Sequence, residues 1–178
     1  EGEEPAVVRA AFSFKNQGLG HPILIGREAQ VQRAMEQMGI APGTLEILNA
    51  RLSDNNPVYT DMLYARLQRD GYLKRDAQRL VNQDRNVFGC CMLKNGDADG
   101  MVTGVTRNYD VALNDSLLVL DPIPGQAVIG MSMVINRGRT VFIADTSVTE
   151  LPQGEDLANI AIEAARAVRS LGFSPRVA

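Results

Sequence analysis

The chain has 178 residues, of which 45% are hydrophobic and 22% are charged, and its formal net charge is -3. These values are typical of a globular protein with one large domain or two small ones. No run of about 20 apolar residues is present, and the acidic start at 1–4 lacks the basic and apolar segments of a signal peptide. We therefore expect a cytoplasmic protein with no membrane partner, and the negative net charge argues against a nucleic-acid partner.

The chain has two cysteines, Cys90 and Cys91, and a single histidine, His21. A cross-link between neighbouring cysteines closes almost no loop, and their apolar surroundings favour small buried residues. One histidine, followed directly by Pro22, supplies neither a zinc cluster nor a Ser-His-Asp triad. We therefore assign no metal site and no catalytic residue to this chain.

Helical and strand patterns alternate along the first 120 residues. Apolar spacing predicts helices at 5–16, 28–38, 57–69, 76–93 (in one or two pieces) and 110–120. Short apolar or β-branched runs predict strands at 22–26, 45–48 and 100–105. The first of these runs is wholly apolar, which indicates a strand that is covered on both faces.

The strongest break in the pattern is Asp121-Pro122-Ile123-Pro124-Gly125, and we place a domain boundary there, between 1–120 and 121–178. Beyond it we expect strands at 127–136 and 140–144 joined by a hairpin turn, a helix within 151–171, and the start of another strand at 176–178. The first helix has no strand before it and the last strand is short. We therefore expect the fold to be truncated at both ends.

This alternation predicts an α/β fold with mostly parallel sheets and helices on both faces. In such sheets ligands bind at the carboxyl ends of the strands. The loops that follow Val105 and Ala144 are therefore the candidate binding sites.

The first candidate site is the segment 104–109, which follows a predicted strand and opens a helix. Backbone N–H groups at a helix start attract anions, and Arg107 would reinforce them. Arg107, Asn108 and Tyr109 are our ligand-binding candidates here. A structural role for Arg107 fits the sequence equally well.

The second candidate site is the end of the strand at 140–144. Asp145 and Thr146 follow it, and we include both as ligand-binding candidates. The commoner role of aspartate after a strand is to accept hydrogen bonds from nearby backbone N–H groups. Both interpretations of Asp145 stay open.

Three other motifs have simpler interpretations. Gly18-Leu19-Gly20 lies between a helix and a strand, so it indicates a helix end rather than a nucleotide-binding loop. Asp97-Ala98-Asp99-Gly100 lacks the closing glutamate of a calcium loop and indicates a tight turn. The arginine-rich stretch 66–85 suggests solvated helix faces or a subunit interface, and direct contact with a ligand is a further, less favoured alternative.

Three segments resemble the phosphate acetyl/butyryl transferase family, namely 94–104, 141–148 and 156–162. Four more resemble the version of that domain found at the C-terminus of bacterial hybrid NADP-dependent malic enzymes, namely 49–53, 63–69, 80–88 and 104–109. The resemblance covers essentially the whole chain.

This resemblance implies two α/β subdomains, similar to those of isocitrate and isopropylmalate dehydrogenases, with a CoA-binding cleft between them. It also implies an N-terminal region of the same protein that oxidatively decarboxylates malate to pyruvate. That region, outside this chain, would carry the NADP and a divalent metal. Acetyl-CoA is then the expected ligand of the present domain, as an effector rather than a cofactor.

One departure from the family pattern bears on function. The family has a substrate-binding arginine in a Thr-Leu-Arg-Pro pattern, where this chain has Ala112-Leu113-Asn114-Asp115. Asparagine supplies no fixed positive charge to a phosphate or an acyl phosphate. By the same resemblance, the serine-arginine segment of the family's active site would lie beyond Ala178.

These observations favour an acetyl-CoA-binding regulatory and assembly domain of a malic enzyme that does not itself catalyse. Two alternatives stay open. One is an active phosphate acetyltransferase, which forms acetyl phosphate and CoA from acetyl-CoA and phosphate. The other is a purely structural module through which the protein forms a homo-oligomer.

Overall fold

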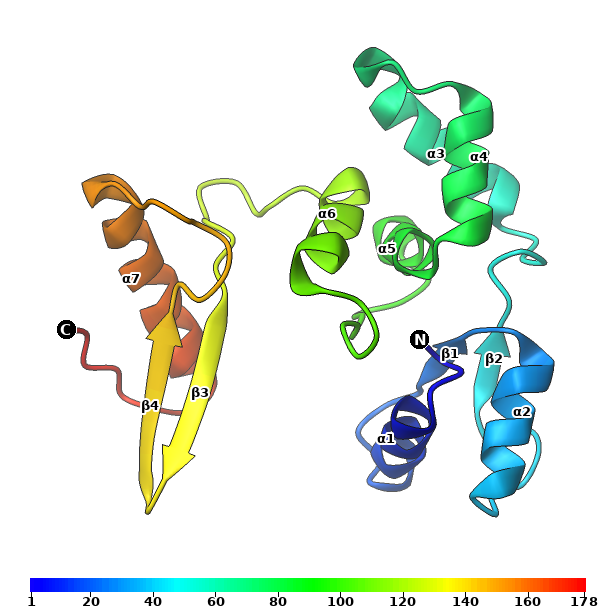
Figure 1. Ribbon diagram of the computed structural model, residues 1–178, viewed down its shortest axis with the longest axis horizontal. Coiled ribbons are helices and arrows are strands. Elements are labelled where there is room, and N and C mark those ends of the chain that lie inside the picture. Colours follow the sequence, from blue (N-terminus) through cyan, green and yellow to red (C-terminus); the bar gives the residue numbers. More distant parts are fainter. The chain divides into compact units, whose positions relative to one another are not determined.

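The computed structural model describes all residues, 1–178, and has an α/β fold with two small sheets. The chain forms two compact units, Glu1–Leu120 and Asp121–Ala178, which are described separately below. The division between them falls at the proline-rich segment 121–125. Figure 1 shows the elements of each unit.

The first unit contains most of the helices. Its elements are α1 (Pro5–Asn16), β1 (Ile23–Ile25), α2 (Glu28–Gln37), β2 (Glu46–Leu48), α3 (Asn56–Leu67), the short 3-10 helix η1 (Gln68–Asp70), α4 (Lys74–Gln83), α5 (Arg85–Asn95) and α6 (Tyr109–Val119). Strands β1 and β2 pair in parallel, with Leu24 opposite Ile47. The crossover between them is α2, as expected for a βαβ unit.

Helices cover both faces of the β1–β2 sheet, as its wholly apolar first strand predicted. Leu24 and Ile47 lie on one face and contact an apolar cluster of α1 and α2 residues, which includes Val8, Val31 and Met35. Ile23, Ile25 and Leu48 lie on the other face and pack against a second cluster, from α3, α4 and α5. The carboxyl ends of both strands are therefore fixed by packing from two sides.

The predicted helix at 76–93 is two helices, α4 and α5, because Asp84 interrupts it. Asp84 has an extended backbone (φ -101°, ψ 116°), and its Oδ1 accepts hydrogen bonds from the N–H groups of Asn86 and Val87. This is the usual way in which aspartate begins a helix. Cys90 and Cys91 lie in α5 with no exposed surface, and burial raises the pKa of Cys91 to about 12. Both cysteines are therefore buried thiols, as the sequence indicated.

The predicted strand at 100–105 is wrong. This segment has no strand conformation, and the side chain of Val102 is 99% exposed. Its β-branched residues favour an extended chain, but a strand also needs a partner, and the sheet ends with β1 and β2. Contacts with distant side chains hold the segment instead.

The second unit contains β3 (Met131–Asn136), β4 (Arg139–Ala144) and α7 (Gly154–Ser170). The two strands form the predicted hairpin, whose turn residues Arg137 and Gly138 both have positive φ angles of 46° and 77°. Because this pair is antiparallel, the expectation of mostly parallel sheets holds only for β1–β2. The first strand begins at Met131 rather than at residue 127, and 176–178 forms no strand.

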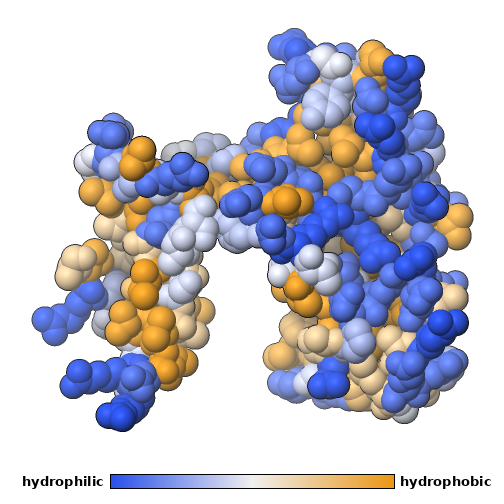
Figure 2. All heavy atoms as spheres, in the orientation of Figure 1, coloured by the Kyte–Doolittle hydropathy of each residue, from blue (hydrophilic) through white to orange (hydrophobic).

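Helix α7 covers the hairpin on one side only. The Phe142 ring of β4 packs edge-to-face on Phe173, with 5.4 Å between the ring centres. Val134 and Val141 pair across the two strands, and their side chains are exposed (46% and 55%). Figure 2 shows this apolar surface on the hairpin.

No helix in the structure combines the length and the apolar character that crossing a membrane requires.

Candidate functional site

The loop before α6 is held by the carboxylate of Glu1. Oε2 of Glu1 accepts hydrogen bonds from the N–H groups of Gly104 and Val105, each at 2.9 Å. Oε1 accepts from the N–H of Thr106 at 2.7 Å and from its hydroxyl at 2.8 Å. Gly104 has a φ of 112°, which residues with a side chain rarely adopt, so a glycine is needed for this turn.

These contacts keep the Glu1 side chain ionised. Burial alone would raise its pKa, but the hydrogen bonds from 104–106 outweigh that effect and lower the pKa to about 2. The predicted anion-binding N–H groups of this loop therefore have a carboxylate of the same chain as their partner.

Arg107 makes two ion pairs inside the first unit. Its Nη1 lies 2.6 Å from Oδ2 of Asp84 and 2.6 Å from Oδ2 of Asp115. Burial would lower the pKa of Arg107, but the two carboxylates raise it above its usual value. Arg107 thus joins the N-terminus of α5 to α6, which is the structural role that the sequence left open. Its contact with a ligand stays a prediction.

Asn86 completes this network from within the core. The residue is only 3% exposed, and its Nδ2 donates to Oδ2 of Asp115 at 3.0 Å. Its Oδ1 accepts a hydrogen bond from the Thr103 hydroxyl at 2.8 Å. The loop is therefore tied to α5 and α6 at Thr103 and Arg107, on either side of the Glu1 contacts.

The exposed part of the first candidate site is the start of α6. Asn108 precedes the helix, and its side chain makes no capping hydrogen bond. The Tyr109 side chain is 45% exposed. These two candidates lie at the surface beside Arg107, at a helix start that the Asn108 side chain does not cap.

Asp145 accepts hydrogen bonds from four backbone N–H groups of its own unit. The donors are Gly130 (2.7 Å), Ser147 (3.2 Å), Val148 (3.2 Å) and Thr149 (2.8 Å). Burial would raise the pKa of Asp145, and these bonds lower it. This is the commoner role weighed from the sequence, and it fixes the loop after β4.

Thr146 lies in the same loop, where its N–H donates to the Gly130 carbonyl at 3.1 Å. A Cβ on Gly130 would lie 2.8 Å from the Thr146 hydroxyl, so only glycine fits there. Asp145 and Thr146 thus form one closed turn of the second unit. Arg107, Asn108 and Tyr109 are neighbours in the first unit.

Asn114, which the sequence analysis placed where the family has an arginine, lies on α6 with an exposed side chain. The next residue, Asp115, pairs with Arg107 and Asn86. The segment around Arg107 therefore contains one arginine and two carboxylates. These charges sum to -1, so the segment has no unpaired positive charge to offer an anionic ligand.

Sequence reasoning missed four residues that build this site, namely Glu1, Asp84, Asn86 and Asp115. The order Asp84-Arg85-Asn86 at a helix start was a signal for the role of Asp84. The other three act across 8 to 105 residues of chain. No local pattern marks contacts of that kind.

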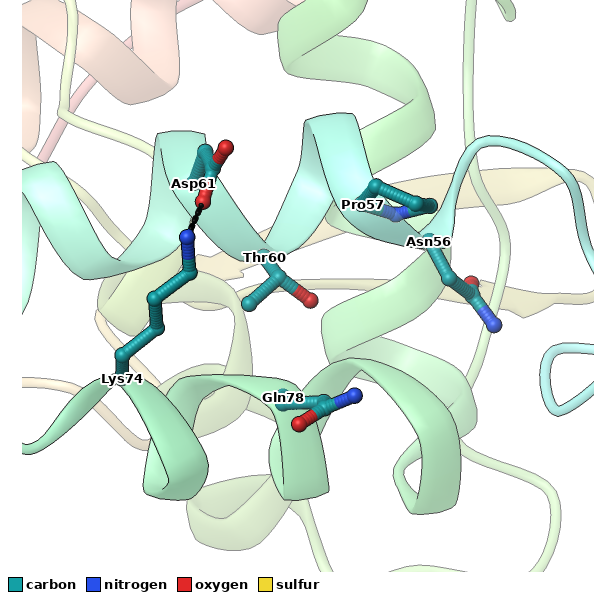
Figure 3. A pocket seen from close by; sticks show the side chains of 6 residues that line it. All are labelled: Asn56, Pro57, Thr60, Asp61, Lys74 and Gln78. Carbon is teal, nitrogen blue, oxygen red and sulfur yellow. Dashed lines mark ion pairs between the residues drawn. The ribbon is translucent and has the colours of Figure 1, made fainter.

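The first unit also has two surface hollows away from this loop. One, of about 250 Å³, lies between α3 and α4, where Lys74 Nζ and Asp61 Oδ1 are 2.5 Å apart (Figure 3). The other, of about 370 Å³, lies beyond the ends of β1 and β2. No group of three or more histidine, cysteine, aspartate or glutamate side chains is placed to hold a metal ion.

Comparison with known proteins assigns the family. The model of the family described as "Phosphate acetyl/butaryl transferase" matches residues 1–178. An NADP-dependent malic enzyme of Rhizobium meliloti is 52% identical over 180 residues, which cover 100% of this chain and 24% of that protein. A phosphate acetyltransferase of Corynebacterium glutamicum is 25% identical over 100% of this chain and 54% of its own length.

The solved structures agree with this assignment. The EutD phosphotransacetylase from Staphylococcus aureus matches with a TM-score of 0.87 and 25% identity, over 98% of this chain and 53% of that chain. The present chain thus spans about a quarter of the malic enzymes that it matches and about half of the phosphate acetyltransferases. It belongs to the phosphate acetyl/butaryl transferase family.

Proposed function

We propose that this chain is the acetyl-CoA-binding regulatory and assembly domain of an NADP-dependent malic enzyme. The observation that carries the proposal is the 52% identity to a malic enzyme over the whole chain, against 25% to a phosphate acetyltransferase. The match lies in the C-terminal part of the malic enzymes. The parent reaction would be the oxidative decarboxylation of malate to pyruvate, in the cytoplasm. NADP and the divalent metal would bind the catalytic region of that protein and not these residues.

The charges near α6 favour a binding role over acetyl transfer. A transferase must stabilise the negative charge of phosphate or of an acyl phosphate, and an unbalanced arginine is suited to that task. Arg107 already pairs with two carboxylates, and Asn114 carries no charge. Acetyl-CoA binding draws on a larger contact area and depends less on any single charge.

We assign the acetyl-CoA contacts to Asn108 and Tyr109, with Arg107, Asp145 and Thr146 as the remaining candidates. The first two are exposed at an uncapped helix start. Regulation further requires that acetyl-CoA bind two states of the enzyme with different affinity. A homo-oligomer formed through this domain would transmit the difference to the catalytic region.

The test is malate-dependent NADP reduction by the complete protein, measured with increasing acetyl-CoA. We expect a saturable change in rate, and Tyr109→Ala should raise the acetyl-CoA concentration that gives half the effect by roughly tenfold. Arg9→Gln, at an exposed residue of α1, is the matched control and should leave the curve unchanged. A rate that acetyl-CoA never alters would refute the regulatory role.

Active phosphate acetyltransfer is the second candidate, supported by the fold shared with two phosphotransacetylases at a TM-score of 0.87. It predicts acetyl phosphate formation when the complete protein is given acetyl-CoA and phosphate. Formation of acetyl phosphate at a rate comparable to malate oxidation would favour this candidate over the regulatory one. Light scattering on the complete protein tests assembly, and a monomer would remove that part of the proposal.

A further inference from the structure

The larger hollow of the first unit lies where ligands bind in parallel sheets. Gly26 follows β1 directly, and Asn49, Ala50 and Arg51 follow β2, so both carboxyl ends open on it. The Gly26 N–H donates to the Leu48 carbonyl at 2.9 Å, which fixes the two strand ends side by side. Residues from the junction of α4 and α5 close the other side.

Three arginines line this hollow, and no acidic residue does. They are Arg27, Arg51 and Arg85. Glu3 pairs with two of them, through Arg27 Nη2 at 2.9 Å and Arg85 Nη2 at 2.5 Å. Three positive charges against one carboxylate leave two uncompensated, and the Arg51 side chain is exposed with no ion pair or hydrogen bond of its own.

The same hollow has an amide group without a partner. Oδ1 of Asn82 is buried and makes no hydrogen bond. A buried polar atom of this kind costs free energy unless a ligand or a water molecule satisfies it. The residues of the hollow therefore offer positive charge for an anion and, beside it, an amide oxygen that can accept a hydrogen bond. Oδ1 of Asn56, which lines the hollow between α3 and α4, is unpaired in the same way, so the charge is what distinguishes this site.

The hollow between α3 and α4 makes the contrast clear (Figure 3). Its only charged residues, Lys74 and Asp61, pair with each other at 2.5 Å, so it carries no net charge. It is also smaller, about 250 Å³ against about 370 Å³. The α3–α4 hollow therefore lacks the excess of positive charge that the β1–β2 hollow has.

We propose that the hollow at the ends of β1 and β2 binds the phosphate group of a small phosphorylated molecule. The planar guanidinium of arginine donates two parallel hydrogen bonds to phosphate, and such charge-assisted bonds are short and strong. Arg51 is the principal contact because it is unpaired, and Arg85 and Arg27 supply the surrounding positive charge. The site is separate from the loop before α6, so it does not depend on the regulatory function proposed above.

The phosphate group could belong to a phosphate ester such as CoA or be free inorganic phosphate, and a binding experiment distinguishes the two. The complete protein is titrated calorimetrically with inorganic phosphate, with CoA and with 3′-dephospho-CoA, in a chloride buffer of constant ionic strength. Tighter binding of CoA than of 3′-dephospho-CoA would identify a phosphate ester as the ligand. Binding of inorganic phosphate, with competition against CoA, would identify the free anion.

The decisive variant is Arg51→Gln, because the exposed and unpaired Arg51 side chain contributes little to folding. We expect it to weaken phosphate-dependent binding by roughly tenfold or more. Arg33→Gln removes the same charge from an exposed position of α2 that does not line the hollow, and it should change the affinity by less than about twofold.

Failure to bind any of the three probes would overturn the proposal. The proposal would also be overturned if Arg51→Gln and Arg33→Gln changed the binding affinity by the same factor. CoA binding that Tyr109→Ala weakens and Arg51→Gln leaves intact would support the α6 site and reject this one. The two proposals therefore fail separately.

Discussion

Two loops of this protein are each organised by a single carboxylate, but the carboxylates come from different distances along the chain. The loop at 103–107 is held by Glu1, which is 103 to 105 residues away from its three N–H donors. The loop at 145–149 is held by Asp145, whose donors are 2 to 15 residues away. The first loop depends on the packing of a whole unit, and the second is almost self-contained.

This difference between the two loops bears on how the proposed regulation by acetyl-CoA would work. Thr103 and Arg107 are bonded to Asn86, Asp84 and Asp115, so a shift in α5 or α6 moves the loop between them. If movement of α5 or α6 changes the affinity for a ligand at the start of α6, binding of that ligand must in turn favour one position of α5 and α6, because linkage is reciprocal. The turn around Asp145 has few such connections and is suited to holding one shape.

The largest effect that separates the two loops is expected from Asn86→Ala. The change removes the hydrogen bond of the Thr103 hydroxyl to Asn86 and that of Asn86 to Oδ2 of Asp115, which then keeps only its contact with Arg107. It should cost about 2–4 kcal/mol of stability in the first unit. Hydrogen exchange of the complete protein should show faster exchange in 84–89 and in 103–107, with 145–149 unchanged.

The matched control is Asn114→Ala, at an exposed position of α6. Its effect should stay within about 0.5 kcal/mol. Equal exchange in the two variants would mean that the Asn86 network does not support the loop.

A smaller and more local effect is expected from Asp145→Ala. Four backbone N–H groups lose their acceptor, but water reaches part of this turn, so the cost should be about 1–2 kcal/mol. Faster exchange should be confined to residues 130 and 146–149. Asp145→Asn keeps one acceptor oxygen, so its stability and its exchange rates at 146–149 should lie between those of Asp145→Ala and the natural protein. Loss of protection throughout β3 and β4 would show that the turn is less self-contained than its hydrogen bonds indicate.

The helices followed from the sequence because their signals are local. Apolar spacing placed α1 at 5–16, as observed. The sequence left open whether 76–93 forms one helix or two, and the structure has two, because the Asp84 side chain begins α5 through its own neighbours. The apolar run at 23–25 likewise forms a strand that is covered on both faces.

The errors and omissions have one physical cause, which is contact between distant segments. The run at 100–105 has β-branched residues but no neighbouring strand, and Glu1 is its partner instead. The arginines of the β1–β2 hollow, Arg27, Arg51 and Arg85, are brought together only by the crossover through α2 and the turn between α4 and α5. In the sequence analysis, Arg27 and Arg51 fall in loops between predicted elements, and neither is given a binding role.

The smallest expected effect is a pH dependence of the Glu1 contacts. The pKa of Glu1 is lowered to about 2 in the folded protein, below its ordinary value of 4.5. A carboxylate with a lowered pKa stabilises the folded state fully above its unfolded pKa, and this contribution is lost as the pH falls toward the folded value. Protection of the 104–106 amides, corrected for intrinsic exchange, should therefore be constant from pH 7 to about pH 5 and decrease between about pH 4.5 and 2.

Glu1→Gln isolates this contribution, because glutamine keeps one acceptor oxygen but does not ionise in this range. We expect lower protection of 104–106 at pH 7 and no further loss due to this residue in acid. Glu3 gives an internal comparison. Hydrogen bonds from Arg27 lower the pKa of Glu3 to about 2, and the Arg27 N–H is bonded to Glu3 Oε1 at 2.8 Å. The Arg27 amide should thus lose protection in acid in both proteins. If protection of the 104–106 amides still fell with pH in Glu1→Gln, ionisation of Glu1 would not be its cause and the prediction would be wrong.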